Sequence, residues 1–447
     1  MNLPITNDRN VMNPDQVGPG PQAEWQTPRA VLEISVTAHS KAIFNYDGDT
    51  SANGYVDWHL TQQVAETQFP LLINCLKQFQ EENNAYLNTI GETFEKDLTD
   101  YQPSEEWGND ISQACAGHWE NSVSRDKYLW DLAKSGYNLF NTVFPIGSKL
   151  RNLIDSLPIG SLIDINWFSE IPGYVSNVPW TIMYCEEPKN KEPINAKNFW
   201  GLRFRLDFQC YQIENISKAL GSVNDSYVGH AYYWKGEGEI VHEADWQKKR
   251  MKKLRNHTSL PNNIQTDPRD QILKWLGNPN PNPMPVLYFF CQGSVSQEKQ
   301  VKLVFGNDPY DTDSVTLREL DLPSNSFINS SLIFCNACES GHHVGVLAQN
   351  RLETHFFDRG CAAYIGTIGK TPVILASKFA AAFFHFFYGR VDGKIVSAGE
   401  AAVQARQFLW NKYHNIGGLL YMYVNEYELY MANSEELDQL RRLRVAK

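Results

Sequence analysis

The chain has 447 residues, of which 42% are hydrophobic and 20% charged. This composition is ordinary for globular proteins and excludes a chain that is mostly disordered. The 40 basic and 51 acidic residues give a formal net charge of −11, which argues against the phosphate backbone of a nucleic acid as a partner. At about 150 residues per domain, the length allows up to about three domains.

Targeting and membrane signals are missing from the sequence. The N-terminal stretch MNLPITNDRNVMNPDQ has neither the basic n-region nor the apolar h-region of a signal peptide. The longest apolar stretch, from Val373 to Tyr388, is interrupted by polar residues and is too short to span a bilayer, so it predicts a buried helix. The eight cysteines are scattered and mostly lie in apolar runs. These features predict a cytoplasmic protein with reduced thiols and no membrane partner.

The first part of the chain mixes predicted strands with long helical tracts. Residues 1–28 are rich in Pro, Asn, Asp and Gln and predict an irregular arm. Apolar periodicity predicts helices at 62–84 and 127–144, and strands at 29–38, 161–168, 178–185 and 198–208. The stretch NPNPNPMP at 278–285 predicts a linker, because proline can neither continue a helix nor donate a hydrogen bond to a neighbouring strand.

One strong basic run lies at residues 248–255. Its six positive residues are Lys248, Lys249, Arg250, Lys252, Lys253 and Arg255. The favoured interpretation is a solvated helix face, and a site for an anionic partner is the alternative.

After the linker, short apolar strands alternate with helices. The predicted strands lie at 286–291, 332–337 and 361–367, followed by a late strand region at 419–431. The predicted helices lie at 344–359, 373–388, 401–414 and 434–444, and Ser397 with Glu400 forms a capping box before the third of them. Fully apolar strands separated by helices predict an α/β fold, with a mostly parallel sheet flanked by helices on both faces.

Two strand ends carry the residues that could do chemistry. The first predicted strand ends in Cys291-Gln292-Gly293-Ser294, and the second continues through Asn336-Ala337-Cys338-Glu339. Sites in open parallel sheets lie beyond the carboxyl ends of the strands. A cysteine placed there is held by its strand, and free backbone N–H groups in the following turn can face a developing oxyanion. Both strand ends therefore offer a cysteine, Cys291 or Cys338, at a reasonable place for a nucleophile.

The sequence around these strand ends resembles the CHAT family, caspase-like peptidases related to separase. The runs VLYFFCQGS at 286–294, LIFCNACES at 332–340 and GCAAYIGT at 360–367 carry the resemblance. The run GEAAVQARQF, with NVPWTIMY and FWGLRFRL upstream, extends it to roughly residues 30–430. The resemblance implies a caspase-like three-layer sandwich. It also implies a degenerate N-terminal caspase-like half at 29–283 and a C-terminal half at 284–447 that carries the cysteine site.

Carried over by this resemblance, Cys338 takes the nucleophile position, and the N–H groups of Gly293 and Cys338 would form the oxyanion hole. The family's catalytic histidine would stand directly before Gly293, where this chain has Gln292. A glutamine amide does not titrate in the working pH range, so it can neither accept the thiol proton nor protonate a leaving amine. We expect Gln292 and Cys338 to lie side by side at the ends of adjacent parallel strands.

Two functions are consistent with a glutamine, Gln292, in place of the family's histidine. In the first, the chain is a pseudoprotease of a bacterial defence or conflict system that binds a peptide or protein partner at a protease-derived site. In the second, it is an active cysteine endopeptidase whose base comes from a partner or from His342, His343 or His230. Neither function needs a cofactor or a metal. A Rossmann-like cofactor enzyme is disfavoured, because no glycine-rich phosphate loop follows a strand.

Three further patterns favour ordinary structural roles. Cys335 and Cys338 form a single Cys-x-x-Cys pair, whereas a zinc site needs four ligands. The loop from Asn307 to Asp313 has three aspartates without the glycine and glutamate of a calcium loop, and a role in selecting a basic substrate residue is its alternative. His385 lies within an apolar helix pattern and is predicted to be a core residue.

Overall fold

The computed structural model describes most of the predicted sheet and its helices. The described residues are 29–36, 41–46, 51–55, 63–65, 67–68, 70–78, 91–101, 122–169, 178–189, 192–209, 220–222, 228–233, 237–254, 269–270, 273, 286–295, 301–306, 313–316, 319, 331–338, 352–357, 361–389, 395–425, 428–432 and 436. The predicted arm at 1–28 and the predicted linker at 278–285 lie outside them. So do His342, His343 and most of the predicted helix at 434–444.

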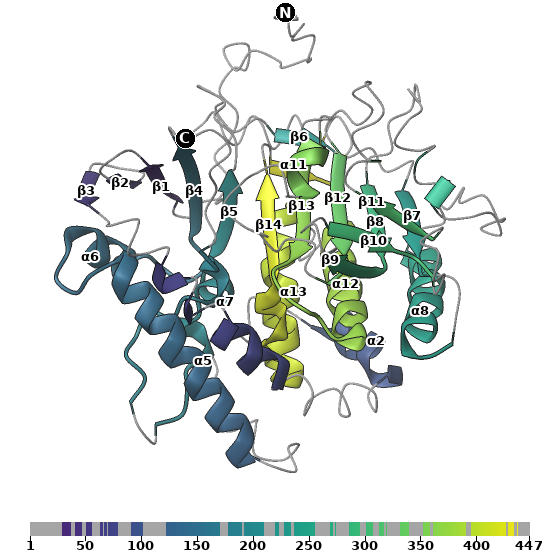
Figure 1. Cartoon of the computed structure of the whole chain (residues 1–447), viewed down its shortest axis with the longest axis horizontal. Helices are drawn as coiled ribbons and strands as arrows, with labels where there is room; N and C mark the ends of the chain where they lie inside the picture. Colours follow the sequence, from purple (N-terminus) through teal and green to yellow (C-terminus); the bar gives the residue numbers. More distant parts are fainter. Residues whose placement is uncertain are drawn as a thin grey trace, which may run out of the picture.

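A ten-stranded sheet with the order β3-β2-β1-β4-β5-β14-β13-β12-β8-β7 forms the centre of the molecule (Figure 1). Its strands are β1 (Arg29–Val36), β2 (Lys41–Tyr46), β3 (Ser51–Tyr55), β4 (Leu162–Ser169), β5 (Arg205–Gln209), β7 (Val228–Tyr232), β8 (Val286–Phe290), β12 (Ser331–Asn336), β13 (Cys361–Thr367) and β14 (Tyr421–Asn425). Two smaller sheets contain β9 (Gln292–Val295), β10 (Val301–Val304) and β11 (Ser314–Thr316), and β6 (Leu220–Ser222) and β15 (Glu428–Tyr430).

The large sheet consists of two parallel blocks that run in opposite directions. Strands β1, β4, β5 and β14 are parallel to one another, and so are β13, β12, β8 and β7. The blocks meet at the antiparallel pair β13–β14, and β2 and β3 add an antiparallel edge. The mostly parallel sheet predicted from the apolar runs is therefore confirmed.

Helices cover both faces of the sheet. They are α2 (Gly91–Asp100), α5 (Ser122–Val143), α6 (Lys149–Ser156), α7 (Trp200–Arg203), α8 (Glu239–Leu254), α11 (Leu352–Phe357), α12 (Val373–Tyr388) and α13 (Ala398–Tyr413), with 3-10 helices η3 (Trp180–Ile182), η4 (Ala196–Asn198) and η6 (Ile416–Leu420). In Figure 1, α5 and α6 lie below the β1–β4 end of the sheet, and α12 packs between α8 and α13.

Successive side chains of β8 contact helices on opposite faces of the sheet. Tyr288 packs against Phe384 of α12, whereas the next residue, Phe289, stacks on Phe356 of α11. Successive side chains of a strand point to opposite faces, so α11 and α12 form the two outer layers around this part of the sheet. The predicted α/β fold of three layers is confirmed.

One predicted strand is wrong and another is shortened. The segment Val178–Cys185 contains the 3-10 helix η3, and only Tyr184 forms an isolated bridge, to Phe199. All its residues are buried, and burial on all sides makes a segment apolar without requiring an extended backbone. The predicted strand at 198–208 begins with α7, and β5 starts at Arg205.

Two helices of the last third agree closely with the prediction, whereas only Leu352–Phe357 of the predicted helix at 344–359 is described as a helix, α11. The buried helix expected from Val373 to Tyr388 is α12, with these same limits. The N-cap of α13 is Ser397, whose Oγ accepts a hydrogen bond from the Glu400 N–H at 3.2 Å. The late strand region is divided into η6, β14 and β15.

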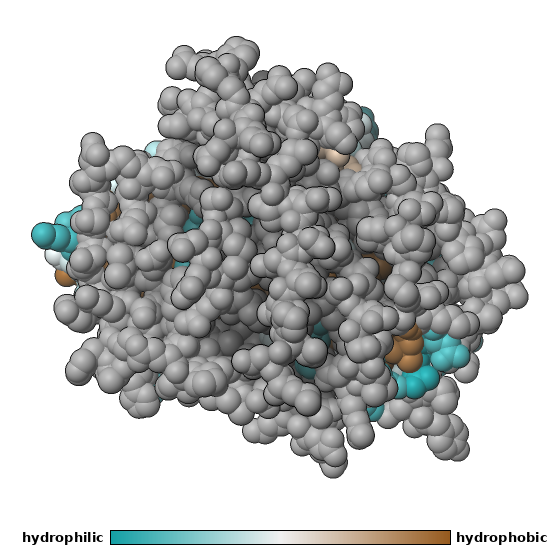
Figure 2. Space-filling model, turned by 90° about the horizontal axis from the view of Figure 1, so that it is seen from above, coloured by the Kyte–Doolittle hydropathy of each residue, from teal (hydrophilic) through white to brown (hydrophobic). Residues whose placement is uncertain are grey.

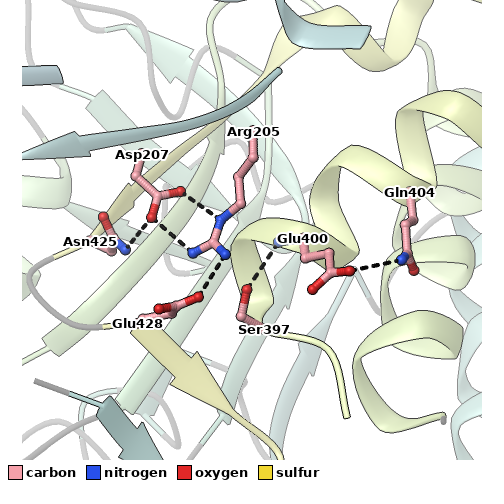
Figure 3. Close-up of polar contacts among 7 residues, drawn as sticks. All are labelled: Arg205, Asp207, Ser397, Glu400, Gln404, Asn425 and Glu428. Carbon is pink, nitrogen blue, oxygen red and sulfur yellow. Dashed lines mark hydrogen bonds and ion pairs between the residues drawn. The ribbon is translucent and has the colours of Figure 1, made fainter. Parts of the chain in front are cut away.

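Polar contacts join β5 to the end of the chain (Figure 3). Arg205 forms ion pairs with Asp207 at 3.0 Å and with Glu428 at 2.6 Å, and Asn425 donates a hydrogen bond to Asp207 at 3.1 Å. Gly399 in the first turn of α13 covers this cluster, since a Cβ atom at Gly399 would lie 2.8 Å from the Arg205 Nε. Charged groups therefore connect two segments that are more than 200 residues apart.

The described surface carries few large hydrophobic residues. Seen from above in Figure 2, the described residues show only small brown spots beside hydrophilic ones. The large hydrophobic residues found exposed among the described ones are Leu71, Ile146 and Ile159. No helix in the described part of the chain is both long enough and apolar enough to cross a membrane.

The basic run is not uniformly solvated. Its first residues lie on α8, where Lys249 is exposed and Lys248 pairs with Asp245 at 3.1 Å. Arg250 is buried and lies 3.5 Å from Glu95 of α2. The prediction of a solvated helix face is thus wrong for Arg250, which connects two helices.

Candidate functional site

The carboxyl ends of β8 and β12 lie side by side. These parallel strands pair Phe334 with Tyr288 and Asn336 with Phe290. The Cys291 N–H donates to the Asn336 carbonyl at 3.4 Å, one residue beyond the end of β8. Continuing the register by two residues brings Cys338 opposite Gln292, as expected from the sequence.

Gly293 lies directly against the backbone of Cys338. A Cβ atom at residue 293 would lie 1.7 Å from the Cys338 carbonyl oxygen and 3.1 Å from its nitrogen. No side chain fits in this space, because the atoms it would meet belong to the backbone and cannot rotate away. The close approach explains the glycine after Gln292 and brings the Gly293 and Cys338 backbones together.

Replacing Gly293 by Ala should separate these two backbones. We expect Gly293→Ala to lower the free energy of unfolding by about 1–3 kcal/mol, the usual cost of inserting a group into packed structure. The rate of Cys338 alkylation should change as well. Ser294→Ala is the matched control, because Ser294 is the exposed next residue and should shift stability by less than about 0.5 kcal/mol. Denaturant unfolding measures the change in stability, and thiol labelling measures the rate of Cys338 alkylation. Equal results for Gly293→Ala and Ser294→Ala would contradict the tight contact.

Gln292 is exposed at the start of β9. It pairs with Val304 of β10, and Val304 pairs in turn with Ser314 of β11. After β8 the chain thus continues through Gln292 directly into a small antiparallel sheet. The exposed Gln292 side chain can form hydrogen bonds with a bound group, but it cannot transfer a proton.

Cys338 is half-buried, and its thiol faces the start of α12. The Sγ donates to the Thr371 carbonyl at 3.5 Å, two residues before α12 begins at Val373. A thiol that donates to a carbonyl is stabilised in its protonated form, because the carbonyl oxygen repels a thiolate. The N-terminus of α12 acts in the other direction, because the partial positive charge of a helix N-terminus stabilises anions.

A buried hydrogen-bond network supports the strand just before Cys338. Asn336 donates to the Ala376 carbonyl at 2.8 Å and to the Tyr288 hydroxyl at 3.0 Å, and its Oδ1 accepts from Tyr421 at 2.8 Å. The Tyr288 hydroxyl donates to Gln247 of α8. Burial raises the pKa of Tyr288 and Tyr421 well above the ordinary tyrosine value, so both hydroxyls remain donors. The network connects β12 to its neighbour β8, to β14, and to helices α8 and α12.

Sequence reasoning missed Thr367, which also contacts the site. Thr367 ends β13, is fully buried, and donates its hydroxyl to the Ala337 carbonyl at 2.6 Å. Its signal in the sequence is weak: a threonine at the end of a strand that is otherwise apolar. Nothing in the spacing indicates that this hydroxyl reaches the residue before Cys338.

His230 is not placed to act as a base for Cys338. It lies on β7, is 1% exposed, and pairs in register with Tyr288, four residues before Gln292. That separation is about 13 Å along a strand, with β8 lying between His230 and β12. Burial lowers the pKa of His230 to about 3, and its Nδ1 lies 2.8 Å from the Tyr232 hydroxyl. The structure excludes His230 as the missing base.

His385 of α12, predicted to be a core residue, lies only at the margin of the core. It is partly buried, and burial together with the positive charge of Arg250 lowers its pKa to about 4.

The other cysteines near the site are buried. Cys335 pairs with Phe289 inside the β8–β12 ladder, and Cys291 lies just beyond β8. Burial raises the pKa of Cys291 well above its ordinary value, and the nearby Cys335 and Cys338 raise it further. Cys338 is therefore the more accessible thiol at these strand ends. In the part of the chain that the structure describes, no group of three His, Cys, Asp or Glu residues is arranged to hold a metal ion.

The aspartate-rich loop is described only at its last residue. Residues 307–312 lie outside the described ranges, whereas Asp313 is buried. A Cβ atom at Gly306 would lie 2.3 Å from the Asp313 carboxylate. At Asp313, the prediction of a solvated turn is wrong.

No protein-family model matches the chain, and no curated protein matches it either. Among solved structures, the chain is similar to separase from the Saccharomyces cerevisiae separase–securin complex, with 10% identity and a TM-score of 0.46. That match covers 90% of this chain and 30% of the separase chain. Another match is the Arg-specific cysteine proteinase gingipain R, with 9% identity, a TM-score of 0.37 and 68% of both chains covered.

Proposed function

We propose that this chain is a caspase-like protein of the CHAT type that binds a peptide or protein partner at a protease-derived site. In this proposal it is a pseudoprotease, because Gln292 stands where the base is needed. The contact between Gly293 and the Cys338 backbone carries the proposal. It brings the backbones of Gly293 and Cys338 together, which supports the proposal that their N–H groups would bind a peptide carbonyl beside the Cys338 thiol.

The surroundings of the thiol support loss of catalysis. The Cys338 Sγ donates to the Thr371 carbonyl, an arrangement that suits a neutral thiol. The histidine on β7 lies too far along the sheet to accept its proton. Loss of a general acid–base group typically costs about 10²–10⁴ in rate, which would leave binding as the main activity of the site.

One observation favours the alternative, an active endopeptidase with Cys338 as nucleophile. Helix α12 begins two residues after the carbonyl that the thiol contacts, and a helix N-terminus lowers the cost of forming a thiolate. In that case His342, His343 or a partner would supply the base. A role in a bacterial defence or conflict system follows from the CHAT resemblance and belongs to both functions.

The test measures the rate of iodoacetamide alkylation at Cys338 against pH, by mass spectrometry of the peptide that contains it. We expect slow labelling near pH 6 in the natural chain. In Gln292→His, labelling at this pH should rise about tenfold, which corresponds to about 1.4 kcal/mol of thiolate stabilisation. The new imidazole would accept the thiol proton and leave a positive charge beside the sulfur.

Ser294→His is the matched control, because it places an imidazole at an exposed position two residues further along β9. It should leave the labelling rate unchanged. Fast labelling of the natural chain below pH 6.5, with no gain in Gln292→His, would contradict the pseudoprotease proposal. The alternative then predicts that Cys338→Ala abolishes cleavage of the partner protein.

A further inference from the structure

Thr367 controls the peptide group that leads into Cys338. Its hydroxyl donates to the Ala337 carbonyl at 2.6 Å, and both residues are almost completely buried. Thr367 belongs to β13, which lies on the opposite side of β12 from β8 and Gly293. The Ala337 carbonyl therefore points toward β13.

The planar peptide group transmits this orientation to Cys338. In a trans peptide the carbonyl and the following N–H point in opposite directions. With the Ala337 carbonyl held toward β13, the Cys338 N–H points away from β13, toward the β8 side. Gly293 lies on that side, where its missing Cβ would be 3.1 Å from the Cys338 nitrogen.

The Thr367 side chain reaches β12 beyond the last residue pair of the β12–β13 ladder. The ladder between β12 and β13 pairs Phe334 with Ile365. Beyond Thr367, the Ile368 N–H donates to the Leu420 carbonyl at 2.9 Å, on the side of β14. The hydroxyl of Thr367 therefore extends the contact with β12 three residues beyond Phe334, up to the peptide before Cys338.

We propose that Thr367 is a positioning residue that aims the Cys338 N–H at a bound carbonyl oxygen beside Gly293. This inference rests on the proposed function, which places a peptide carbonyl at this site. Thr367 acts through the Ala337–Cys338 peptide and does not contact the bound group. Its effect appears when negative charge develops on the bound oxygen, because a correctly aimed N–H is then most valuable.

Two reagents separate this role from general stability. p-Nitrophenyl acetate acylates Cys338: the thiolate attacks the ester carbonyl, a thioester forms, and p-nitrophenolate leaves. Negative charge develops on the carbonyl oxygen in this reaction. Iodoacetamide alkylates the same sulfur by displacing iodide and forms no oxyanion. The ratio of acylation to alkylation at Cys338 is measured at pH 9 by mass spectrometry. It therefore measures how well the Cys338 N–H stabilises the developing oxyanion, independently of the reactivity of the thiol.

We expect Thr367→Val to lower this ratio roughly tenfold. Removing an oxyanion donor costs about 10²–10³ in rate, and a donor that is turned away but still present should lose less. Thr367→Ser keeps the hydroxyl and should restore the natural ratio. Thr367→Cys, with its weaker donor, should fall between them and provides a second measurement if the valine variant does not fold.

The outcomes distinguish this inference from the proposed function. If Cys338 of the natural chain acylates no faster, relative to its alkylation, than the partly exposed Cys75, the carbonyl site does not exist and both ideas fail. If Cys338 shows a raised ratio that Thr367→Val and Thr367→Cys leave unchanged, the carbonyl site stands and the role of Thr367 is overturned.

Discussion

Residues 284–447, expressed without residues 1–283, are expected to be insoluble or to lack a cooperative unfolding transition. The reason is that groups buried in this C-terminal part form their hydrogen bonds with the N-terminal part. Arg406, 1% exposed, donates to the Gly201 carbonyl at 3.3 Å, and Gln407 donates to the Leu202 carbonyl at 3.0 Å. Glu428 loses its ion pair with Arg205 as well.

The free energy lost with these contacts is comparable to the whole stability of a domain. Each buried group left without its partner costs about 1–3 kcal/mol, and a charged group costs more. A whole domain is stable by only about 5–15 kcal/mol. Apolar packing is lost in addition, because Phe94 of α2 packs against Phe408 and Tyr413 of α13.

Circular dichroism and denaturant unfolding of the fragment test this expectation. Co-expression with residues 1–283 is the matched control, since it supplies the missing partners in a separate chain and should restore a folded complex. A soluble fragment that unfolds cooperatively would make the linker at 278–285 a true domain boundary. Until then, the division into 29–283 and 284–447 stays a prediction.

Arg205→Met should destabilise the chain by about 3–5 kcal/mol, the range for breaking a buried ion pair from one side. The guanidinium binds Asp207 and Glu428, whose side chains are 0% and 5% exposed. Burial alone would lower the pKa of Arg205, but these two carboxylates outweigh that effect and raise it well above the ordinary value. Methionine fills similar space but leaves the carboxylates without this positive charge (Figure 3).

The matched control breaks a similar contact at the surface. Lys189 lies 3.7 Å from Glu192, with side chains 73% and 61% exposed, so Lys189→Met should change stability by less than about 1 kcal/mol. Denaturant midpoints of both variants against the natural chain provide the comparison. Equal small shifts would show that the Arg205 cluster is not a main connection between the two parts of the chain.

The arrangement at Cys338 could be anticipated because it depends on local pattern. The runs VLYFFC and LIFCNA are continuously apolar and short, which is the signature of strands buried on both faces. Neighbouring parallel strands have their carboxyl ends at the same edge of the sheet. Gln292 and Gly293 were therefore expected to lie close to Cys338. The helix limits at Val373 and Tyr388 and the cap at Ser397 follow from equally local signals.

Other features depended on contacts that no local pattern reveals. The segment from Val178 to Cys185 is as apolar as a strand, but it is buried by surrounding elements without belonging to the sheet. His230 was a candidate base by residue type alone, and only its register opposite Tyr288 removed it. Arg250 belonged to a basic run, yet α2 buries it beside Glu95.

The sequence by itself determined the α/β class, the central strands and the identity of the residues at their ends, because periodicity and strand length are properties of neighbouring residues. The tertiary structure alone decided two other features: the contact of Thr367 with Ala337 and the ion pair of Arg205 with Glu428. Each joins residues 30 or more positions apart, and such contacts arise only when strands from different parts of the chain settle into one register. A single sequence records the residue types for these contacts, but not the register that brings them together.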